Sequence, residues 1–390
     1  MAGPGMRRGV NPVLLLLLAL MVLALGGLGL VSHAPNRLVS GRAIGLLALP
    51  QGGGALLGLP LAGLLVLALL PPARWRALLT LLLAEGLLYG LTAVAGTAAT
   101  LLAGDGDGIA RTSLGGGYWA AAALCVLAGA DAVSRLTTHR GWRLLLNAQM
   151  ALPVVALLAS GQLNALSLLQ EYDNRADVFH EALWQHLGLL AGTLVPALLI
   201  GLPLGVLCAR SVRWRGPLFP LLNIIQTIPS IALFGLLLAP LAGLAAAFPW
   251  LARAGISGIG RAPAIIALVL YALLPLVRSV VAGLQAVPPQ VLESARGMGM
   301  TRGQLLRRVE LPLALPVILA GVRVVAVQTV GMAMVAALIG AGGFGAIMFQ
   351  GLLSSALDLV LLGVIPVVLL AVVIDGLFTL LVSVLEPSRR

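Results

Sequence analysis

The residues most able to do chemistry in this 390-residue chain are one serine in a glycine motif and four histidines. Gly255-Ile256-Ser257-Gly258 matches the G-x-S-G pattern of intramembrane serine proteases. A nucleophilic serine needs a base within hydrogen-bond reach, most often a histidine. The histidines are His33, His139, His180 and His186. None follows Ser257 or lies inside an apolar run long enough to cross a membrane, so we predict a loop and no catalytic residues.

Metal and cofactor motifs are also incomplete. Cys125 and Cys208 fall within or at the end of apolar segments, which argues against a disulfide framework or a metal site. Gly104–Gly108 resembles a calcium loop but lacks the later ligands and the bidentate glutamate, so a flexible outer turn is expected. Gly340–Gly345 matches G-x-G-x-x-G, but no strand precedes it, and a tight turn or a close helix approach is expected. We predict no cofactor and no metal.

Composition sets the class of protein. Hydrophobic residues make up 60% of the chain and charged residues only 9%, with a mean hydropathy of +1.07. These values indicate a polytopic membrane protein and not a soluble core. The net charge of +11 comes from 24 basic residues, all arginine and mostly in short loops between apolar runs. That distribution is typical of topology signals and not of a nucleic-acid-binding face.

The apolar runs predict an all-α protein with about ten transmembrane helices, because about 20 apolar residues cross a bilayer. The candidate spans are residues 13–31, 55–71, 77–103, 114–134, 144–167, 187–208, 218–242, 262–284, 311–339 and 358–384. The first run, with Arg7 and Arg8 before it and Ser32-His33-Ala34 after it, could also be a signal peptide. Its length exceeds a usual signal-peptide core, which favours a retained helix.

Arginine placement predicts the orientation. If the N-terminus is cytoplasmic, sixteen arginines lie inside and six outside, while Arg278 and Arg323 fall within spans. Positive charge accumulates on the cytoplasmic side of membrane proteins. We therefore expect both termini in the cytoplasm.

A composition change near residue 170 predicts two domains. Residues 171–177 carry most of the acidic charge that is expected outside. We place residues 1–170, a hydrophobic unit of about five spans, in one domain and residues 171–390, with five more, in the other. Val178–His186 is predicted to be a short amphipathic helix on the outer surface.

Glu85, Arg323 and Asp375 lie deep inside predicted spans, where charged residues are costly and are functional candidates. Glu85 lies about 12 Å into its span if the segment is helical. We interpret it as a packed, hydrogen-bonded residue, with a functional role as the alternative. Arg323 and Asp375 lie deep in the ninth and tenth spans. We hypothesise that these two pair with each other as a structural tie.

The most informative segment is Val287–Pro316, which carries several charges between two apolar runs. Pro288 and Pro289 can open a helix, and glycines at 297 and 299 weaken it. Thr301–Gln304 has the spacing of a capping box, so a second helix is expected to begin there. We predict two short helices outside the bilayer on the cytoplasmic side, with Leu311-Pro312 marking the return to the membrane.

This segment resembles the EAA loop of ABC-transporter permease subunits, whose pattern is E-A-A, three residues, G, nine residues, I-x-L-P. The chain has Glu293-Ser294-Ala295, Gly299 and Val309-Glu310-Leu311-Pro312 at those spacings. Serine replaces one alanine, and valine replaces isoleucine. The resemblance implies that residues 285–310 dock on a separate ATPase. Its coupling residues would be Glu293, Ser294, Ala295, Gly299, Leu311 and Pro312. The alternative is a basic loop that only sets topology.

The seventh span contains Gln226-Thr227-Ile228-Pro229-Ser230. Proline removes a backbone hydrogen bond, and neighbouring polar groups can satisfy the freed carbonyls. The stretch resembles the signature of permeases for glycine betaine, choline, proline and related osmoprotectants. We predict a broken helix whose Gln226, Thr227, Pro229 and Ser230 line the translocation pathway; a simple kink is the alternative. Further candidates for the pathway wall, in the ninth span, are Gln328, Thr329 and Met332.

Residues from about 180 to 384 therefore resemble the permease subunit of an osmoprotectant ABC importer, with an N-terminal extension. The resemblance implies a bacterial inner-membrane location among membrane lipids. It also implies two ATPase copies, a periplasmic or lipid-anchored substrate-binding protein, and a second permease copy, identical or closely homologous. Aromatic residues are only 4% of the chain. Quaternary ammonium groups are held by aromatic cages, so high-affinity selection is expected on the binding protein.

The alternative function is an ion-coupled secondary transporter of a small polar solute, working through Glu85, Arg323 and Asp375. Such a transporter has no reason to keep the spacing from Glu293 to Pro312. The spacing therefore favours the ATP-driven importer.

Overall fold

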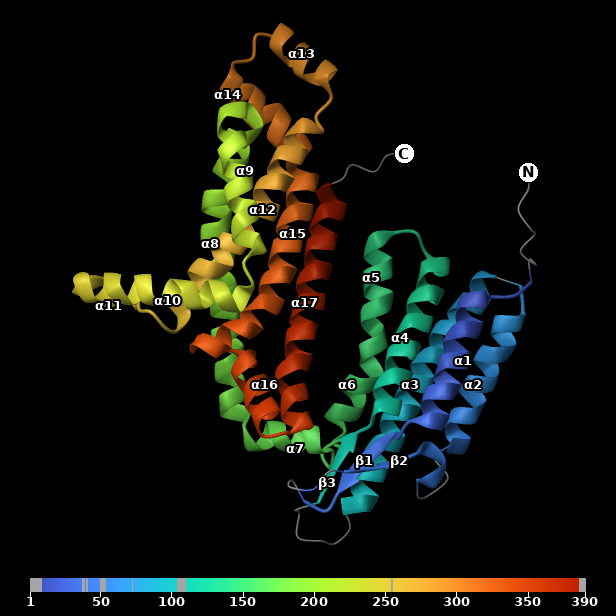
Figure 1. Cartoon of the computed structure of the whole chain (residues 1–390). Helices are drawn as coiled ribbons and strands as arrows, with labels where there is room; N and C mark the ends of the chain where they lie inside the picture. Colours follow the sequence, from blue (N-terminus) through green and yellow to red (C-terminus); the bar gives the residue numbers. More distant parts are fainter. Residues whose placement is uncertain are drawn as a thin grey trace. The chain divides into compact units, whose positions relative to one another are not determined.

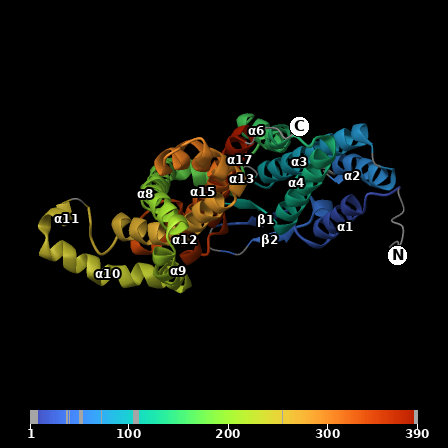
Figure 2. The ribbon, with the colours of Figure 1, turned by 90° about the horizontal axis from the view of Figure 1, so that it is seen from above.

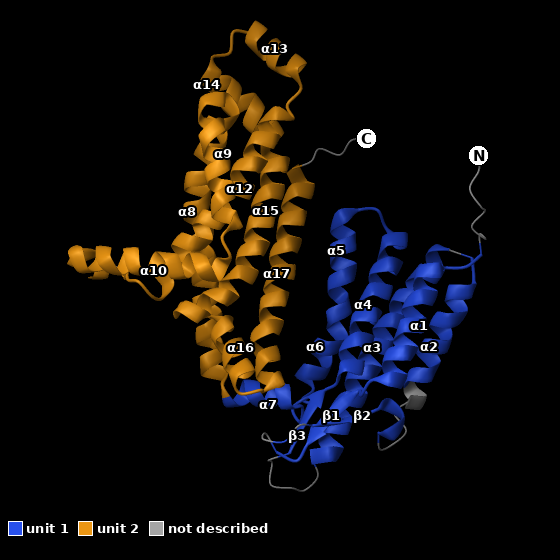
Figure 3. Ribbon diagram, viewed as in Figure 1, with its two compact units in different colours: residues 1–174 blue, residues 175–390 orange. Residues whose placement is uncertain are grey.

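A computed structural model describes residues 9–36, 39, 41–49, 54–71, 73–103, 110–253 and 255–385. The chain divides into two compact units, unit 1 (Met1–Asn174) and unit 2 (Arg175–Arg390), coloured separately in Figure 3. The predicted turn at Gly104–Gly108 lies outside the described residues, as do Arg7, Arg8, Arg37, Arg389 and Arg390.

Unit 1 is built on a four-helix bundle. The helices are α1 (Pro12–Gly27), α2 (Gly54–Leu69), α3 (Arg74–Ala103) and α4 (Gly116–Leu136). Asn11 caps α1, and Pro12 occupies its first turn, where a missing N–H costs nothing. Leu87 and Leu91 of α3 are fully buried in the core between these helices. Three further helices complete the unit, namely α5 (Arg140–Ala148), α6 (Leu152–Ala159) and α7 (Ser167–Asn174).

A three-stranded antiparallel sheet, absent from the all-α prediction, closes one end of unit 1. Its strands are β1 (Val31–Ala34), β2 (Arg42–Ile44) and β3 (Arg111–Leu114), in the order β2-β1-β3. Ser32 pairs with Ala43 on one side and with Ser113 on the other. Each strand has three or four residues, which is too short for alternation to show in the sequence.

Unit 2 is organised around long helices that pack through small residues. Its main helices are α8 (Ala176–Arg210), α12 (Arg261–Gln285), α15 (Leu311–Val335) and α17 (Leu357–Leu385). They run side by side in Figure 1. A Cβ on Gly205 of α8 would stand 2.5 Å from the Val280 Cβ of α12, and one on Gly321 of α15 would stand 2.1 Å from the Ser279 Cβ. Glycine therefore sets how closely these helices approach.

The prediction of an all-α polytopic membrane protein is confirmed, and the number of spans is approximate. Eight helices within the described residues are long and apolar enough to cross a membrane. The first two predicted spans correspond to α1 and α2, which have only 16 residues each. The predicted outer helix Val178–His186 is not a separate element, because α8 runs unbroken from Ala176.

The seventh predicted span is not a single crossing. It divides into α9 (Val212–Thr227) and α10 (Ser230–Ala247), followed by α11 (Pro249–Arg253). In Figures 1 and 2, α10 extends sideways from the bundle formed by α8, α12, α15 and α17. Only Leu233, Phe234 and Leu241 of its eighteen residues are buried. Apolar composition predicted the helix but carries no information on its direction.

Candidate coupling loop and translocation pathway

The candidate coupling loop begins with α13 (Pro289–Gly297), at the same end of unit 2 as the end of α12 (Figure 1). Its C-terminus closes at Gly299, which has a left-handed φ of +79°. The Gly299 N–H donates to the Arg296 carbonyl at 2.9 Å, and the Met300 N–H donates to the Ala295 carbonyl at 3.3 Å. These bonds satisfy carbonyls at the helix end, and a left-handed residue there favours glycine.

The second part of the loop has the predicted capping box. The Thr301 hydroxyl accepts from the Gln304 N–H, and the Gln304 side chain accepts from the Thr301 N–H at 2.9 Å. The helix that starts here is not a separate short helix, however. α14 (Arg302–Leu305) continues through a π-helical turn at Leu306–Glu310 into α15, making one helical segment from Arg302 to Ile339. Leu311 and Pro312 therefore lie within a continuous helix.

The predicted coupling residues divide between the surface and the interior. Glu293 and Ser294 are exposed on α13, whereas Ala295 is buried. The Ser294 hydroxyl donates to the Gln290 carbonyl of its own helix at 2.8 Å. Met298, which the sequence analysis did not single out, is 71% exposed beside them. The loop thus exposes a carboxylate on α13 and an apolar side chain at the residue that directly follows this helix.

An ion pair that the sequence analysis missed lies at the base of the loop. Arg210, the last residue of α8, places Nη2 2.5 Å from Oε2 of Glu310. Glu310 is buried, and Arg210 is about one-third exposed. The contact connects the end of α8 to the π turn that precedes α15. The only available signal was an acidic residue inside the V-E-L-P motif, because the partners are 100 residues apart.

The helix break at Ile228-Pro229 is stabilised by a tyrosine of α12. The Tyr271 hydroxyl donates to the Ile228 carbonyl, and the Gln226 side-chain amide donates to the Tyr271 carbonyl at 2.9 Å. The Thr227 hydroxyl instead donates within α9, to the Ile224 carbonyl at 2.7 Å. The sequence analysis anticipated that polar groups would satisfy the freed carbonyls, but it did not identify Tyr271.

The other pathway candidates lie near this break with different exposure. Thr227 and Pro229 are exposed, whereas Gln226 and Ser230 are half-buried. On α15, Met332 packs against the same apolar cluster as Ile228. The half-buried Gln328 donates to the Met332 sulfur at 3.4 Å. Thr329 is buried and donates to the Val325 carbonyl at 2.7 Å, so its hydroxyl is occupied within its own helix.

Arg323 and Asp375 are brought together between α15 and α17. Nε of Arg323 lies 2.5 Å from Oδ1 of Asp375, and Nη2 lies 2.7 Å from Oδ2. This two-pronged geometry is the strongest form of an arginine–carboxylate contact. The side chains are 38% and 45% exposed, so the pair lies at the surface of this chain and not in its core.

The glycine motif after α15 forms the expected tight turn. Gly340, Gly342 and Gly343 have φ values of +80°, +81° and +78°, which favour glycine. The Gly343 N–H donates to the Gln185 side-chain oxygen at 2.7 Å. The turn leads into α16 (Phe344–Leu353), a helix that the sequence analysis did not predict. Phe344 packs against the buried ring of His186, 5.6 Å between centroids.

Two remaining candidates have ordinary local contacts. The Gln149 side-chain amide donates to Glu85 Oε2 at 3.4 Å within unit 1. The Ser257 hydroxyl donates to the Ile259 carbonyl at 2.6 Å in an irregular segment between α11 and α12. Glu85 is thus hydrogen-bonded, as the sequence analysis interpreted it, and Ser257 lies in a loop, as predicted.

Taken together, the spanning helices and the structured loop after α12 define the class of a multi-pass membrane protein. Residues 201–388 match the family model "Binding-protein-dependent transport system inner membrane component". Residues 7–169 match "ABC transporter permease YehY, N-terminal domain".

Several characterised permeases are similar to about half of this chain. The osmoprotectant import permease OsmW of Salmonella typhimurium is 42% identical over 205 residues, covering 53% of this chain and 90% of that protein. The carnitine transport permease OpuCB of Listeria monocytogenes is 39% identical over 49% of this chain and 81% of its own. The choline permease OpuBB of Bacillus subtilis is 36% identical over 53% and 87%.

The chain belongs to the family of binding-protein-dependent ABC importer permeases. Members of this family work with an ATPase and a substrate-binding protein. In a solved structure of the inward-facing MetNI methionine ABC transporter, one chain aligns over 55% of this chain and 99% of its own, with 24% identity and a TM-score of 0.48.

Proposed function

We propose that this permease imports quaternary ammonium osmoprotectants of the glycine betaine, carnitine and choline type. The proposal draws on the substrates in the names of its relatives. The observation that supports the coupling to ATP is the loop itself, with Glu293 exposed on α13 and Met298 exposed between that helix and the turn at Gly299. A short helix closed by a defined turn can transmit movement from a protein that binds it.

In this proposal, some coupling residues contact the ATPase and the others maintain the conformation of the loop. Glu293 and Ser294 face the ATPase, while buried Ala295 holds α13 against the loop. Gly299 sets the backbone turn. Leu311 and Pro312 lie where the loop becomes α15, so movement of the loop passes directly into a spanning helix. Two ATPase copies would act on two permease copies.

The translocation pathway is proposed to run along the α9–α10 break and the adjoining face of α15. Gln226, Pro229 and Ser230 interrupt the apolar surface at the break, together with the exposed Thr227. Gln328 and Met332 supply the facing wall. Thr329 contributes helix packing on that side and not a free hydroxyl, since its donor is already used.

A second copy of the permease would cover the α10 arm. This helix is apolar along its length, with Ile231, Leu236 and Leu244 from 45% to 60% exposed. It extends sideways from the bundle in both views (Figures 1 and 2). Either an identical chain or a close homologue could cover this apolar surface.

Residues 1–170 are proposed to be an extension of the importer core, which comprises residues 171–390. The division into compact units after Asn174 and the two separate family matches support this assignment. The arginine bias supports an inner-membrane location with both termini in the cytoplasm.

Reconstitution tests the proposed function. The permease, its ATPase and its binding protein are placed in proteoliposomes, and uptake of labelled glycine betaine, carnitine and choline is followed. The proposal expects uptake that requires ATP and the binding protein and is insensitive to ionophores. Uptake by the permease alone, driven by an ion gradient, would refute the ATP-driven assignment. Transport of none of the three compounds by an ATP-hydrolysing complex would refute the substrate assignment.

A further inference from the structure

A hollow of about 220 Å³ lies among one set of helix ends in unit 1, and its lining includes six polar or charged residues. It is formed by the start of α1, the segment from the end of α2 to the start of α3, and the end of α4. The polar residues that line it are Asn11, Arg74, Arg76, Thr80, Asp131 and Arg135. Its three arginines all belong to the set that the arginine bias assigns to the cytoplasmic side.

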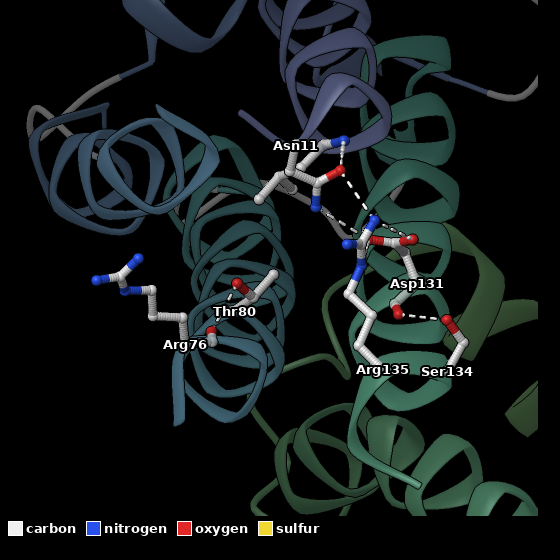
Figure 4. Close-up of polar contacts among 7 residues, drawn as sticks. Asn11, Arg76, Thr80, Asp131, Ser134 and Arg135 are labelled. Carbon is white, nitrogen blue, oxygen red and sulfur yellow. Dashed lines mark hydrogen bonds and ion pairs between the residues drawn. The ribbon is translucent and has the colours of Figure 1, made fainter. Parts of the chain in front are cut away.

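On one wall of the hollow, the charges of Arg135 and Asp131 neutralise each other (Figure 4). Nε of Arg135 donates to Asp131 Oδ2 at 2.9 Å, and its Nη2 donates to Oδ1 at 3.2 Å. The Asn11 amide donates to the same carboxylate at 3.1 Å. The single acidic group of the lining is therefore fully engaged by this wall and would not repel an anion strongly.

The opposite wall carries positive charge without a matching acid. In Figure 4 the Arg76 guanidinium points away from the Asn11–Asp131–Arg135 cluster. Its Nη1 donates to the Pro71 carbonyl, and its Nε is buried without a hydrogen-bond partner. Arg74 is exposed and makes no hydrogen bond or ion pair within the described part of the chain. The lining thus has three arginines and one aspartate, and the surplus charge is on Arg74 and Arg76.

A buried guanidinium N–H without an acceptor is suited to a phosphate oxygen, and the exposed Arg74 lines the same hollow as Arg76. Trp75 lies between the two arginines in sequence and is 57% exposed, as expected of a side chain at the membrane–water interface. Basic pockets between transmembrane helices on the cytoplasmic side are suited to lipid head groups. We propose that this hollow binds a phosphate group through Arg74 and Arg76, and that the phosphate is that of an anionic membrane lipid.

Titration of the full-length permease in neutral detergent tests the site. Thermal unfolding midpoints are measured against dioctanoyl phosphatidylglycerol, dioctanoyl phosphatidylcholine and glycerol 3-phosphate. The main variant is the double substitution Arg74→Gln/Arg76→Gln. The matched control is Arg140→Gln/Arg143→Gln, which removes the same charge from α5 outside the hollow. Because Arg76 also contacts the Pro71 carbonyl, the single variant Arg74→Glu tests the charge at a residue without such a contact.

The proposal expects phosphatidylglycerol to raise the unfolding midpoint of the wild type and of the control with similar half-saturation. The double variant and Arg74→Glu should need at least about tenfold more lipid, as expected for losing charge-assisted bonds. Phosphatidylcholine should have little effect. Equal losses in the control would indicate diffuse surface attraction and overturn the site. A midpoint shift by glycerol 3-phosphate and not by the lipid, abolished by Arg74→Glu, would overturn the lipid source in favour of a soluble phosphate.

Discussion

Replacing Gly299 by alanine isolates the role of the backbone turn that closes α13. Gly299 has φ +79°, and a Cβ built there meets nothing within 4 Å. The substitution therefore adds no steric contact and acts only through the left-handed conformation. That conformation costs a residue with a Cβ about 1–2 kcal/mol. If the ATPase binds only the closed turn, its affinity for the permease should fall by about five- to thirtyfold.

Gly297→Ala is the matched control. Gly297 lies two residues earlier, its Cβ would also meet nothing within 4 Å, and it has no positive φ. It ends the helical part of α13, where alanine is tolerated better than glycine. The control should therefore bind the ATPase as well as the wild type. Gly299→Asn should fall between the two, because asparagine tolerates the left-handed region better than alanine does.

The assay is binding of purified ATPase to each permease variant in detergent, together with the rate of ATP hydrolysis stimulated by the binding protein. Membrane insertion and elution profile should be unchanged, because Gly299 is exposed and remote from the core. Binding of Gly299→Ala within twofold of the wild type would refute the importance of the turn. Equal losses in both glycine variants would show that any added side chain on this surface blocks docking.

Three further predictions concern the spanning helices. Arg323→Ala and Asp375→Ala should each lower thermal stability by up to about 1 kcal/mol, the range for an ion pair whose side chains are partly exposed. The double variant should recover part of that loss, and failure to recover would contradict a structural tie. Tyr271→Phe leaves the Ile228 carbonyl without its donor, which should cost about 1–3 kcal/mol in thermal unfolding and slow uptake; unchanged stability would show that another group satisfies the carbonyl. Arg210→Ala leaves Glu310 buried without its partner, so the substrate transported per ATP hydrolysed should fall, and an unchanged ratio would remove this contact from coupling.

Local signals in the sequence predicted the parts of the site that depend on local chemistry. The capping box at Thr301 arises from residues within a few positions of each other. Gly299 was expected only to weaken the helix, and its left-handed φ was not predicted. Charges are so rare in the apolar runs that Arg323 and Asp375 could be matched without any structure. For the capping box and the ion pair, few alternatives competed with the correct assignment.

The features that the sequence analysis missed depend on the direction of a helix or on contacts between residues far apart in the sequence. Residues 228–229 predicted a break, but nothing in an apolar run specifies that α10 turns sideways. The Arg210–Glu310 pair joins residues 100 positions apart and has no periodic signal. Pro312 suggested a boundary between the loop and the ninth span. The chain instead passes it in a continuous helix, with a π turn just before the proline.

The continuity from Arg302 into α15 changes how the loop would act. If the second loop helix were separate from the ninth span, a hinge between them would let the loop move while the spanning helix stayed still. Here the capped start of α14 and the body of α15 form one continuous helical segment that includes the π turn at Leu306–Glu310. π turns often lie at functional positions in helices, and this one is held to α8 through Arg210. If α13 and α14 move together, we expect a displacement of the loop to tilt α15 against α8 about this contact and to move Gln328 and Met332 relative to the α9–α10 break.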